Sequence, residues 1–215
     1  MAFPFLTIFI IFVLWLALRY ATVKKKTSEK YDNFWGKEAQ ANNTPAKDLS
    51  TLDYLKIPVN RFPFDKWEDD EIQMIEGQIK ELSEKRILNL TGKTNTELKL
   101  EYGTANLDAM TEIGDNFNTL IVLLVDYAKA LMQRGDYEEA AKVLEYGASV
   151  RSDISSNYML LGDCYVALHK QKQIPVIREQ VESMNLMLGH KIVSYLDDLL
   201  ANADANHENF ELSEE

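Results

Sequence analysis

The acidic, thiol and imidazole side chains that could support catalysis do not form a reactive pattern. Adjacent carboxylates occur at Asp69-Asp70-Glu71 and at Asp197-Asp198, and a carboxylate pair can act as general acid and base. Neighbouring residues on a helix point in different directions, so these acids would not converge on one substrate. Cys164 would need a base, and His169 follows it at an unsuitable offset of five residues. We expect Cys164 to fill a small space between helices.

Phosphate-binding and metal-binding chemistry is not indicated either. The segment Thr91-Gly92-Lys93-Thr94 matches the end of a phosphate-binding loop, but the earlier glycine and the strand-to-helix context are absent. His169, His190 and His207 are scattered, and no histidine or cysteine spacing resembles a metal site. We therefore expect no catalytic residues, no cofactor and no metal, and the chain is not predicted to be an enzyme.

Charge and cysteine content narrow the class of protein. The 215 residues carry a formal charge of −11, and residues 27–215 hold 19 basic residues against all 34 acidic ones. Nucleic acid and anionic membrane surfaces repel an acidic body, so we expect no nucleic-acid partner. The negative charge would suit a domain held away from the membrane or one that binds a basic partner. Alternatively, it only maintains solubility. One cysteine excludes an internal disulfide and fits a reducing cytosol.

An uncharged stretch at the N-terminus predicts a membrane anchor. Residues 2–18 as a helix reach about 25 Å, and continuation to residue 23 gives about 33 Å, enough to cross a hydrocarbon core. Trp15 and Tyr20 suit the membrane interface. A cleaved signal peptide, a buried core helix and an interfacial helix are the alternatives. The stretch lacks the basic n-region of the first and the polar face of the last, so residues 1–23 are predicted to span the bilayer.

Basic residues flank this anchor on one side. Arg19, Lys24, Lys25 and Lys26 follow the apolar stretch, and no lysine or arginine precedes it. The positive-inside rule then predicts a single-pass protein with a short N-terminus outside and the C-terminal domain in the cytoplasm. The cluster could also attract anionic lipid, or it only sets the topology.

Residues 24–64 form the predicted juxtamembrane segment and linker. Residues 27–41 hold no proline and can continue the anchor as a helix, with Tyr31, Phe34 and Trp35 on one side. Residues 42–64 hold prolines and asparagines typical of a linker. Their aromatic and aliphatic side chains are too dense for a free chain, so we expect this linker to be pinned to the domain.

Residues 65–116 are predicted to be a helical segment that packs on the C-terminal part of the chain. A helix is expected to begin with Asp65 as its N-cap and to run to about Leu90. Residues 91–104 are predicted to be irregular, with a short extended piece at 98–102. A short helix from Asn106 is expected to end at Gly114.

Residues 117–203 show a pattern that repeats after 34 residues. Leu124, Tyr127, Ala128 and Leu131 overlay on Tyr158, Leu161, Gly162 and Tyr165, and Gly135-Asp136 separates two helical stretches. The order of aromatic, leucine, glycine and tyrosine residues in 158–165 resembles the first helix of a tetratricopeptide repeat (TPR). The segment 135–147 resembles the turn and second helix of one. The resemblance covers residues 121–188 and departs from the pattern at Ser152, Ile174 and Arg178.

The resemblance implies an all-α fold, in which the transmembrane helix precedes a TPR-like stack of antiparallel helical hairpins. A capping helix would come next, and then an acidic tail at 204–215. Small residues such as Gly162 suit the places where helices cross. A generic antiparallel helical bundle is the alternative.

The resemblance also implies a concave partner groove lined by the first helix of each pair. The predicted lining is Val122, Val125, Lys129, Met132, Met159, Asp163 and Val166. Val125, Lys129, Met159 and Asp163 stand where chaperone-binding members of the family carry lysine or asparagine, so a clamp for a C-terminal carboxylate is not expected. An apolar groove would instead suit a helix or an internal chain segment.

Two functions remain open at this point. One is a membrane-anchored adaptor that binds a protein or peptide partner on the cytoplasmic face. The other is a structural subunit of a membrane complex, or a self-assembling homo-oligomeric scaffold, in which the helix at 65–90 fills the groove.

Overall fold

The computed structural model describes residues 4–211, with side chains described for residues 7–25, 27 and 30–202. Within residues 4–211 every regular element is helical, so the predicted all-α class is confirmed. The chain forms two compact units. Unit 1 comprises the N-terminal part up to Thr51 together with Lys93–Met110, and unit 2 comprises Leu52–Gly92 together with the chain from Thr111 onward.

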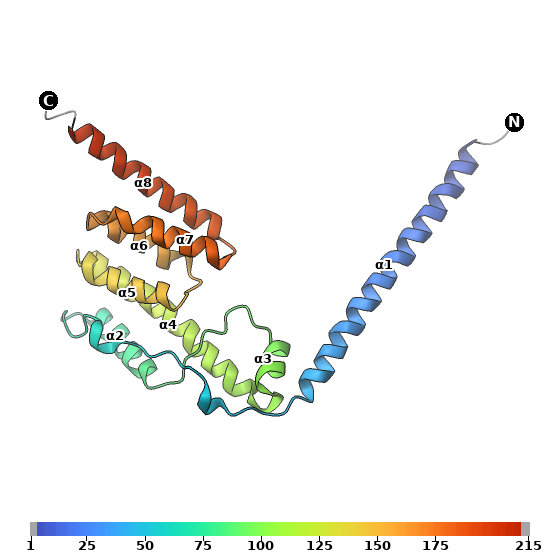
Figure 1. Ribbon diagram of the computed structural model, residues 1–215, viewed down its shortest axis with the longest axis horizontal. Coiled ribbons are helices and arrows are strands. Elements are labelled where there is room, and N and C mark those ends of the chain that lie inside the picture. Colours follow the sequence, from blue (N-terminus) through green and yellow to red (C-terminus); the bar gives the residue numbers. More distant parts are fainter. Residues whose placement is uncertain (1–3, 212–215) are drawn as a thin grey trace. The chain divides into compact units, whose positions relative to one another are not determined.

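The first helix of unit 1, α1, is a single helix over Pro4–Asn42 (Figure 1). Its 39 residues give a length of about 58 Å. The apolar side chains from Ile8 to Leu18 are about half exposed or more, unlike those of a core helix in a soluble protein. The helix is long and apolar enough to span a membrane. The predicted continuation of the anchor through residues 27–41 is confirmed.

The second helix of unit 1, α3, spans Asn95–Tyr102 and corrects the expectation of irregular or extended structure there. Thr94 caps it through a capping box, in which the Glu97 N–H donates to the threonine hydroxyl and the Glu97 carboxylate accepts from the Thr94 N–H. Leu98 and Tyr102, one turn apart, are buried. A short 3₁₀ turn, η3 at Thr104–Asn106, follows, and α3 contacts α1.

The linker is irregular apart from two 3₁₀ turns, η1 at Leu49–Thr51 and η2 at Val59–Arg61. Its later part is pinned within unit 2, as predicted. The Leu55 N–H donates to the Ile87 carbonyl over 2.9 Å, and Ile57 and Phe62 are buried. The linker begins after Asn42, the last residue of α1, which is one residue later than predicted.

The first helix of unit 2, α2, spans Asp70–Ser83 and is shorter at both ends than expected. Asp69 is the N-cap and accepts from the Ile72 N–H, whereas Asp65 lies outside the helix with a left-handed φ of 60°. The buried stripe on the helix ends at Leu82, and Glu84 is the C-cap. A Cβ added at Gly77 would have no other atom within 4 Å, so this glycine is not required for close packing.

Helix α4 spans Leu107–Gln133 and runs through the expected break at Gly114. Met110, Ile113, Phe117 and Leu120 are buried at helical spacing on both sides of that glycine. Burying several such side chains contributes more than the roughly 1 kcal/mol that a glycine costs within a helix.

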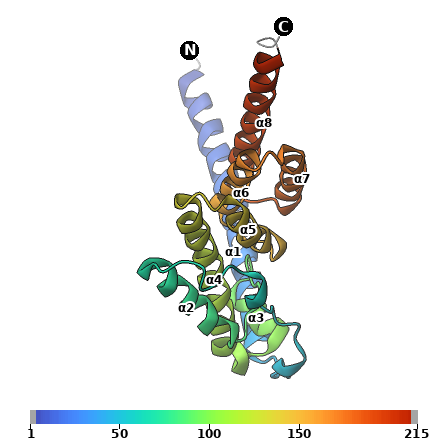
Figure 2. The ribbon, with the colours of Figure 1, turned by 90° about the vertical axis from the view of Figure 1, so that its left-hand side faces the viewer.

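Four helices complete unit 2: α5 at Tyr137–Ser149, α6 at Ser155–Ala167, α7 at Ile174–Met184 and α8 at Gly189–Glu211, with η4 at Gln171–Gln173 before α7. Helix α5 contacts α6, and both α6 and α7 contact α8 (Figure 2). The expected break at Gly135-Asp136 is present, and Gly135 has a left-handed φ of 75°.

Three details differ from what residue types alone favour, namely an N-cap at Asp153 for α6, an end of α7 at Gly189 and an acidic tail from residue 204. Ile154, not Asp153, precedes α6, and no side chain caps that helix. Helix α7 ends at Asn185 in the left-handed conformation, so Gly189 begins α8 and does not close α7. The backbone of α8 extends to Glu211 through most of the predicted tail, and residues 212–215 lie outside the described chain.

Candidate partner-binding surface

The predicted groove residues of α4 lie along one side of that helix. Val122 is 49% exposed and Lys129 is also exposed, whereas Met132 is partly buried and Val125 is 3% exposed. Lys129 donates to Asp126 over 3.1 Å, a pair within the same helix. Val125 therefore belongs to the core, while Val122 and Lys129 remain accessible.

Helix α2 joins α4 on a different side. The Tyr127 hydroxyl donates to Glu76 over 2.9 Å, and the Arg134 guanidinium pairs with Asp69. At about 100° per residue, Tyr127 lies roughly 140° around α4 from Val122. Val122 and Lys129 therefore face away from α2, which lies in the segment 65–90 that could have filled the groove.

The groove residues of α6 are less accessible. Met159, Asp163 and Val166 are all partly buried. The Tyr195 hydroxyl of α8 donates to Asp163 over 2.6 Å, and this carboxylate together with burial raises the pKa of Tyr195 to about 12. Asp163 therefore joins α6 to α8.

Gly162 permits this close approach of α8. A Cβ at Gly162 would lie 2.7 Å from the Leu196 side chain and 2.9 Å from that of Leu199. The expectation that small residues occupy helix crossings is met here. Of the seven predicted lining residues, Val122 and Lys129 are the most available to a partner.

A buried carboxylate organises the junction of α2 and α4. Glu76 is 1% exposed, and its two oxygens accept from the Tyr127 hydroxyl and from the Asp65 N–H, each over 2.9 Å. Burial, reinforced by Glu76, raises the pKa of Tyr127 above its ordinary range. Sequence reasoning did not single out Glu76, although a charged residue one turn after Ile72, on the buried side of α2, was a usable signal.

The residues beside the apolar stretch are exposed on α1. The Arg19 guanidinium lies 5.6 Å from the centre of the Trp15 ring, a cation–π arrangement. Lys24 and Lys25 are exposed, and the side chain of Lys26 lies outside the described residues.

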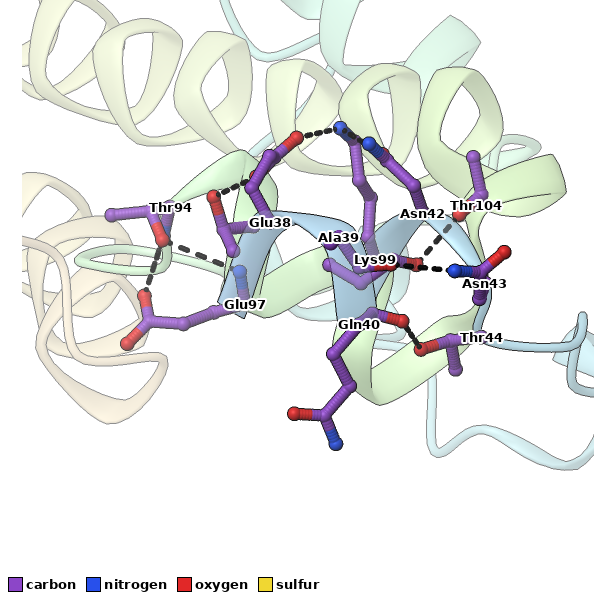
Figure 3. Close-up of polar contacts among 12 residues, drawn as sticks. Glu38, Ala39, Gln40, Asn42, Asn43, Thr44, Thr94, Glu97, Lys99 and Thr104 are labelled. Atoms are coloured by element: carbon purple, nitrogen blue, oxygen red, sulfur yellow. Dashed lines mark hydrogen bonds and ion pairs between the residues drawn. The ribbon is translucent and has the colours of Figure 1, made fainter. Parts of the chain in front are cut away.

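A polar joint fixes the end of α1 to α3 within unit 1 (Figure 3). Glu38 accepts from the Lys99 ammonium and, over 2.6 Å, from the Thr96 hydroxyl. Lys99 also donates to the Asn42 side chain over 2.9 Å. The Glu38 and Lys99 side chains are only 18% and 15% exposed, and the pKa of Glu38 is held below its ordinary value by Lys99 and then Thr96.

The backbone after α3 completes this joint. The Thr104 hydroxyl donates to the Ala41 carbonyl over 2.8 Å, and the Lys47 N–H donates to the Tyr102 carbonyl over 3.0 Å. Gly103, with a φ of 92°, lies so close to the linker that a Cβ would be 2.4 Å from the Pro45 carbonyl oxygen. No sequence pattern predicted this joint.

The thiol and the carboxylates that were considered for catalysis have structural roles. Cys164 is fully buried, and burial raises the pKa of its thiol to about 12. Asp69 caps α2 and pairs with Arg134, and Asp197 accepts from Arg178 over 2.7 Å. In the described part of the chain, no cluster of three or more His, Cys, Asp or Glu residues could hold a metal ion.

No family model, curated protein or solved structure matches this chain.

Proposed function

We propose that this protein is a membrane-anchored adaptor that holds a protein or peptide partner through a TPR-like helical domain. The observation that carries the proposal is the position of Val122 and Lys129 on α4. They are exposed on a side of the helix that points away from the hydrogen bonds with α2. An exposed valine with an exposed lysine two turns farther along the same side of the helix suits an amphipathic helix or an internal segment that carries an acidic residue.

The proposed orientation places this domain in the cytoplasm. Arg19 and the exposed Lys24 and Lys25 follow the apolar part of α1, and the positive-inside rule favours the cytoplasmic side for such residues. The bilayer is then the first partner of the chain, through α1.

A structural or scaffolding role is the second candidate. The bond between Asp163 and Tyr195 favours it, because it joins α6 to α8 at a position predicted to line the groove. In that case the exposed part of α4 would contact other subunits of a membrane complex.

The test compares two exposed valines. Val122→Asp places a charge on the candidate surface, and Val176→Asp is a matched control on α7, where the valine is 61% exposed. Full-length protein is crosslinked in intact membranes and captured, and the attached proteins are compared. We expect Val122→Asp to lose a partner that the wild type and Val176→Asp both retain.

Retention of every partner by Val122→Asp would contradict the adaptor surface. Capture of the chain alone would instead favour the scaffolding role. Charge reversal of Asp163 is less informative, because it also breaks the bond to Tyr195.

A further inference from the structure

Three aromatic side chains lie exposed on α1 between the apolar stretch and the joint with α3. Tyr31, Phe34 and Trp35 are 62%, 54% and 50% exposed. They contact one another edge to face, with ring centres 5.7 Å apart for Tyr31 and Trp35 and 5.4 Å apart for Phe34 and Trp35. Such a cluster on a helix surface is typical of an interface.

The backbone at this cluster lies beyond the lipid headgroup region. If the hydrocarbon core ends near Val23, the helical rise places Tyr31 about 12 Å and Trp35 about 18 Å farther along the axis. The headgroup region adds only about 5–8 Å on each side of the core. A tilt of 40° reduces the two heights to about 9 and 14 Å, which is still outside that region.

The cluster continues the same side of α1 that contacts α3. Tyr31, Phe34, Glu38 and Ala41 follow one another at spacings of three, four and three residues. Glu38 and Ala41 already contact α3 and its following turn. Thr27 lies on the same side four residues before Tyr31, so Thr27, Tyr31 and Phe34 have the 3.5-residue spacing of a seam between two helices.

We propose that the aromatic part of α1 pairs in parallel with the same part of a second copy of this chain. In heptad terms Lys24 and Tyr31 occupy a positions, and Thr27 and Phe34 occupy d positions. Lys30 then occupies g and Trp35 the following e, and these two positions meet across a parallel pair. The lysine of one copy therefore lies over the indole of the other, a cation–π contact made in both directions.

Two further features fit a second copy. Anchors inserted in the same membrane with the same orientation bring identical residues of α1 to the same height. Confinement in the bilayer also raises the effective concentration, which a paired segment of only about four turns needs for stability. Lys24, at the first a position, lowers the stability of the pair but favours one register. The pairing ends before Glu38, because α3 contacts α1 on this side from there onward.

The proposal rests on the membrane anchor of the proposed function but not on its partner surface on α4, because it uses only α1. Its test is disulfide crosslinking of full-length protein reconstituted in liposomes. Thr27→Cys places a thiol on the paired side, and Asn33→Cys places one about 9 Å farther along α1 on the other side of the helix. Cys164 stays in place because it is fully buried, and the unsubstituted chain is the control for it. Free thiols are blocked with a maleimide before electrophoresis.

We expect Thr27→Cys to form a species of twice 24.7 kDa, several-fold more than Asn33→Cys. Replacing Tyr31 and Phe34 together by alanine in the Thr27→Cys chain is expected to remove this excess, whereas Asn33→Ala leaves it unchanged. Equal crosslinking of the two cysteine variants, or none in either, would overturn the proposal. So would capture of a different protein by Thr27→Cys in native membranes in place of the dimer.

Discussion

Replacing Gly103 by alanine is expected to open the joint between α1 and α3. An alanine at a φ of 92° and ψ of 148° is strained by about 1–3 kcal/mol. Its Cβ would also lie 2.4 Å from the Pro45 carbonyl oxygen and 2.5 Å from the Ala46 Cα, so the linker backbone must move by about 1 Å to restore ordinary contact. Together these effects predict a loss of at least about 3 kcal/mol in the local free energy of opening.

Hydrogen exchange measured by mass spectrometry on full-length protein in nanodiscs tests this expectation. A loss of about 3 kcal/mol corresponds to roughly 100-fold faster exchange in peptides covering residues 91–106. Gly92→Ala is the matched control, because Gly92 also has a positive φ, 82°, but no atom within 4 Å of an added Cβ. It should show backbone strain alone, about 1–2 kcal/mol. Equal effects of the two substitutions would refute the close approach of the linker to α3.

Three further predictions concern stability. Gly77→Ala, in the exposed middle of α2, is expected to raise the free energy of unfolding by about 0.5–1 kcal/mol in urea titrations, since no neighbour obstructs the methyl group. Tyr127→Phe is expected to cost about 1.5–3 kcal/mol in the same titrations, because it leaves the buried Glu76 carboxylate without one of its two donors; an unchanged midpoint would show that this bond adds nothing. Lys99 lowers the pKa of Glu38 below its ordinary value of 4.5, so the pairing stabilises the fold at pH values above 4.5. This stabilisation is lost as the pH falls through the lowered pKa. Glu38→Gln should therefore melt below the wild type at neutral pH and approach it in acid, and a pH-independent difference would contradict the assignment.

Most helices could be predicted from the helical spacing of apolar residues. The stripes Ile72–Leu82 on α2 and Leu120–Leu131 on α4 are strong enough to identify both helices, because burial of one side determines them. Their boundaries were harder to predict. Asp65 and Asp69 are equally good caps by residue type. Asp65 is excluded by its left-handed backbone, and its N–H donates to the distant Glu76, which sequence alone does not reveal.

The joint on α3 was missed for a different reason. Its capping box, Thr94 with Glu97, is visible in the sequence, but Lys99 and Glu38 are 61 residues apart and nothing local connects them. The groove lining was predicted from the repeat pattern alone. That pattern identifies a side of a helix, but it does not show that Val125 is buried or that Tyr195 holds Asp163, because both depend on neighbouring helices.

Site-specific photo-crosslinking tests the adaptor proposal most directly. A photoreactive amino acid is placed at Val122 on the candidate surface or at Met74, which is 60% exposed on α2, in full-length protein in its native membrane. The adaptor proposal predicts a specific covalent partner at Val122 and none at Met74. The same partner at both positions, or none at Val122, would contradict a binding surface on this side of α4.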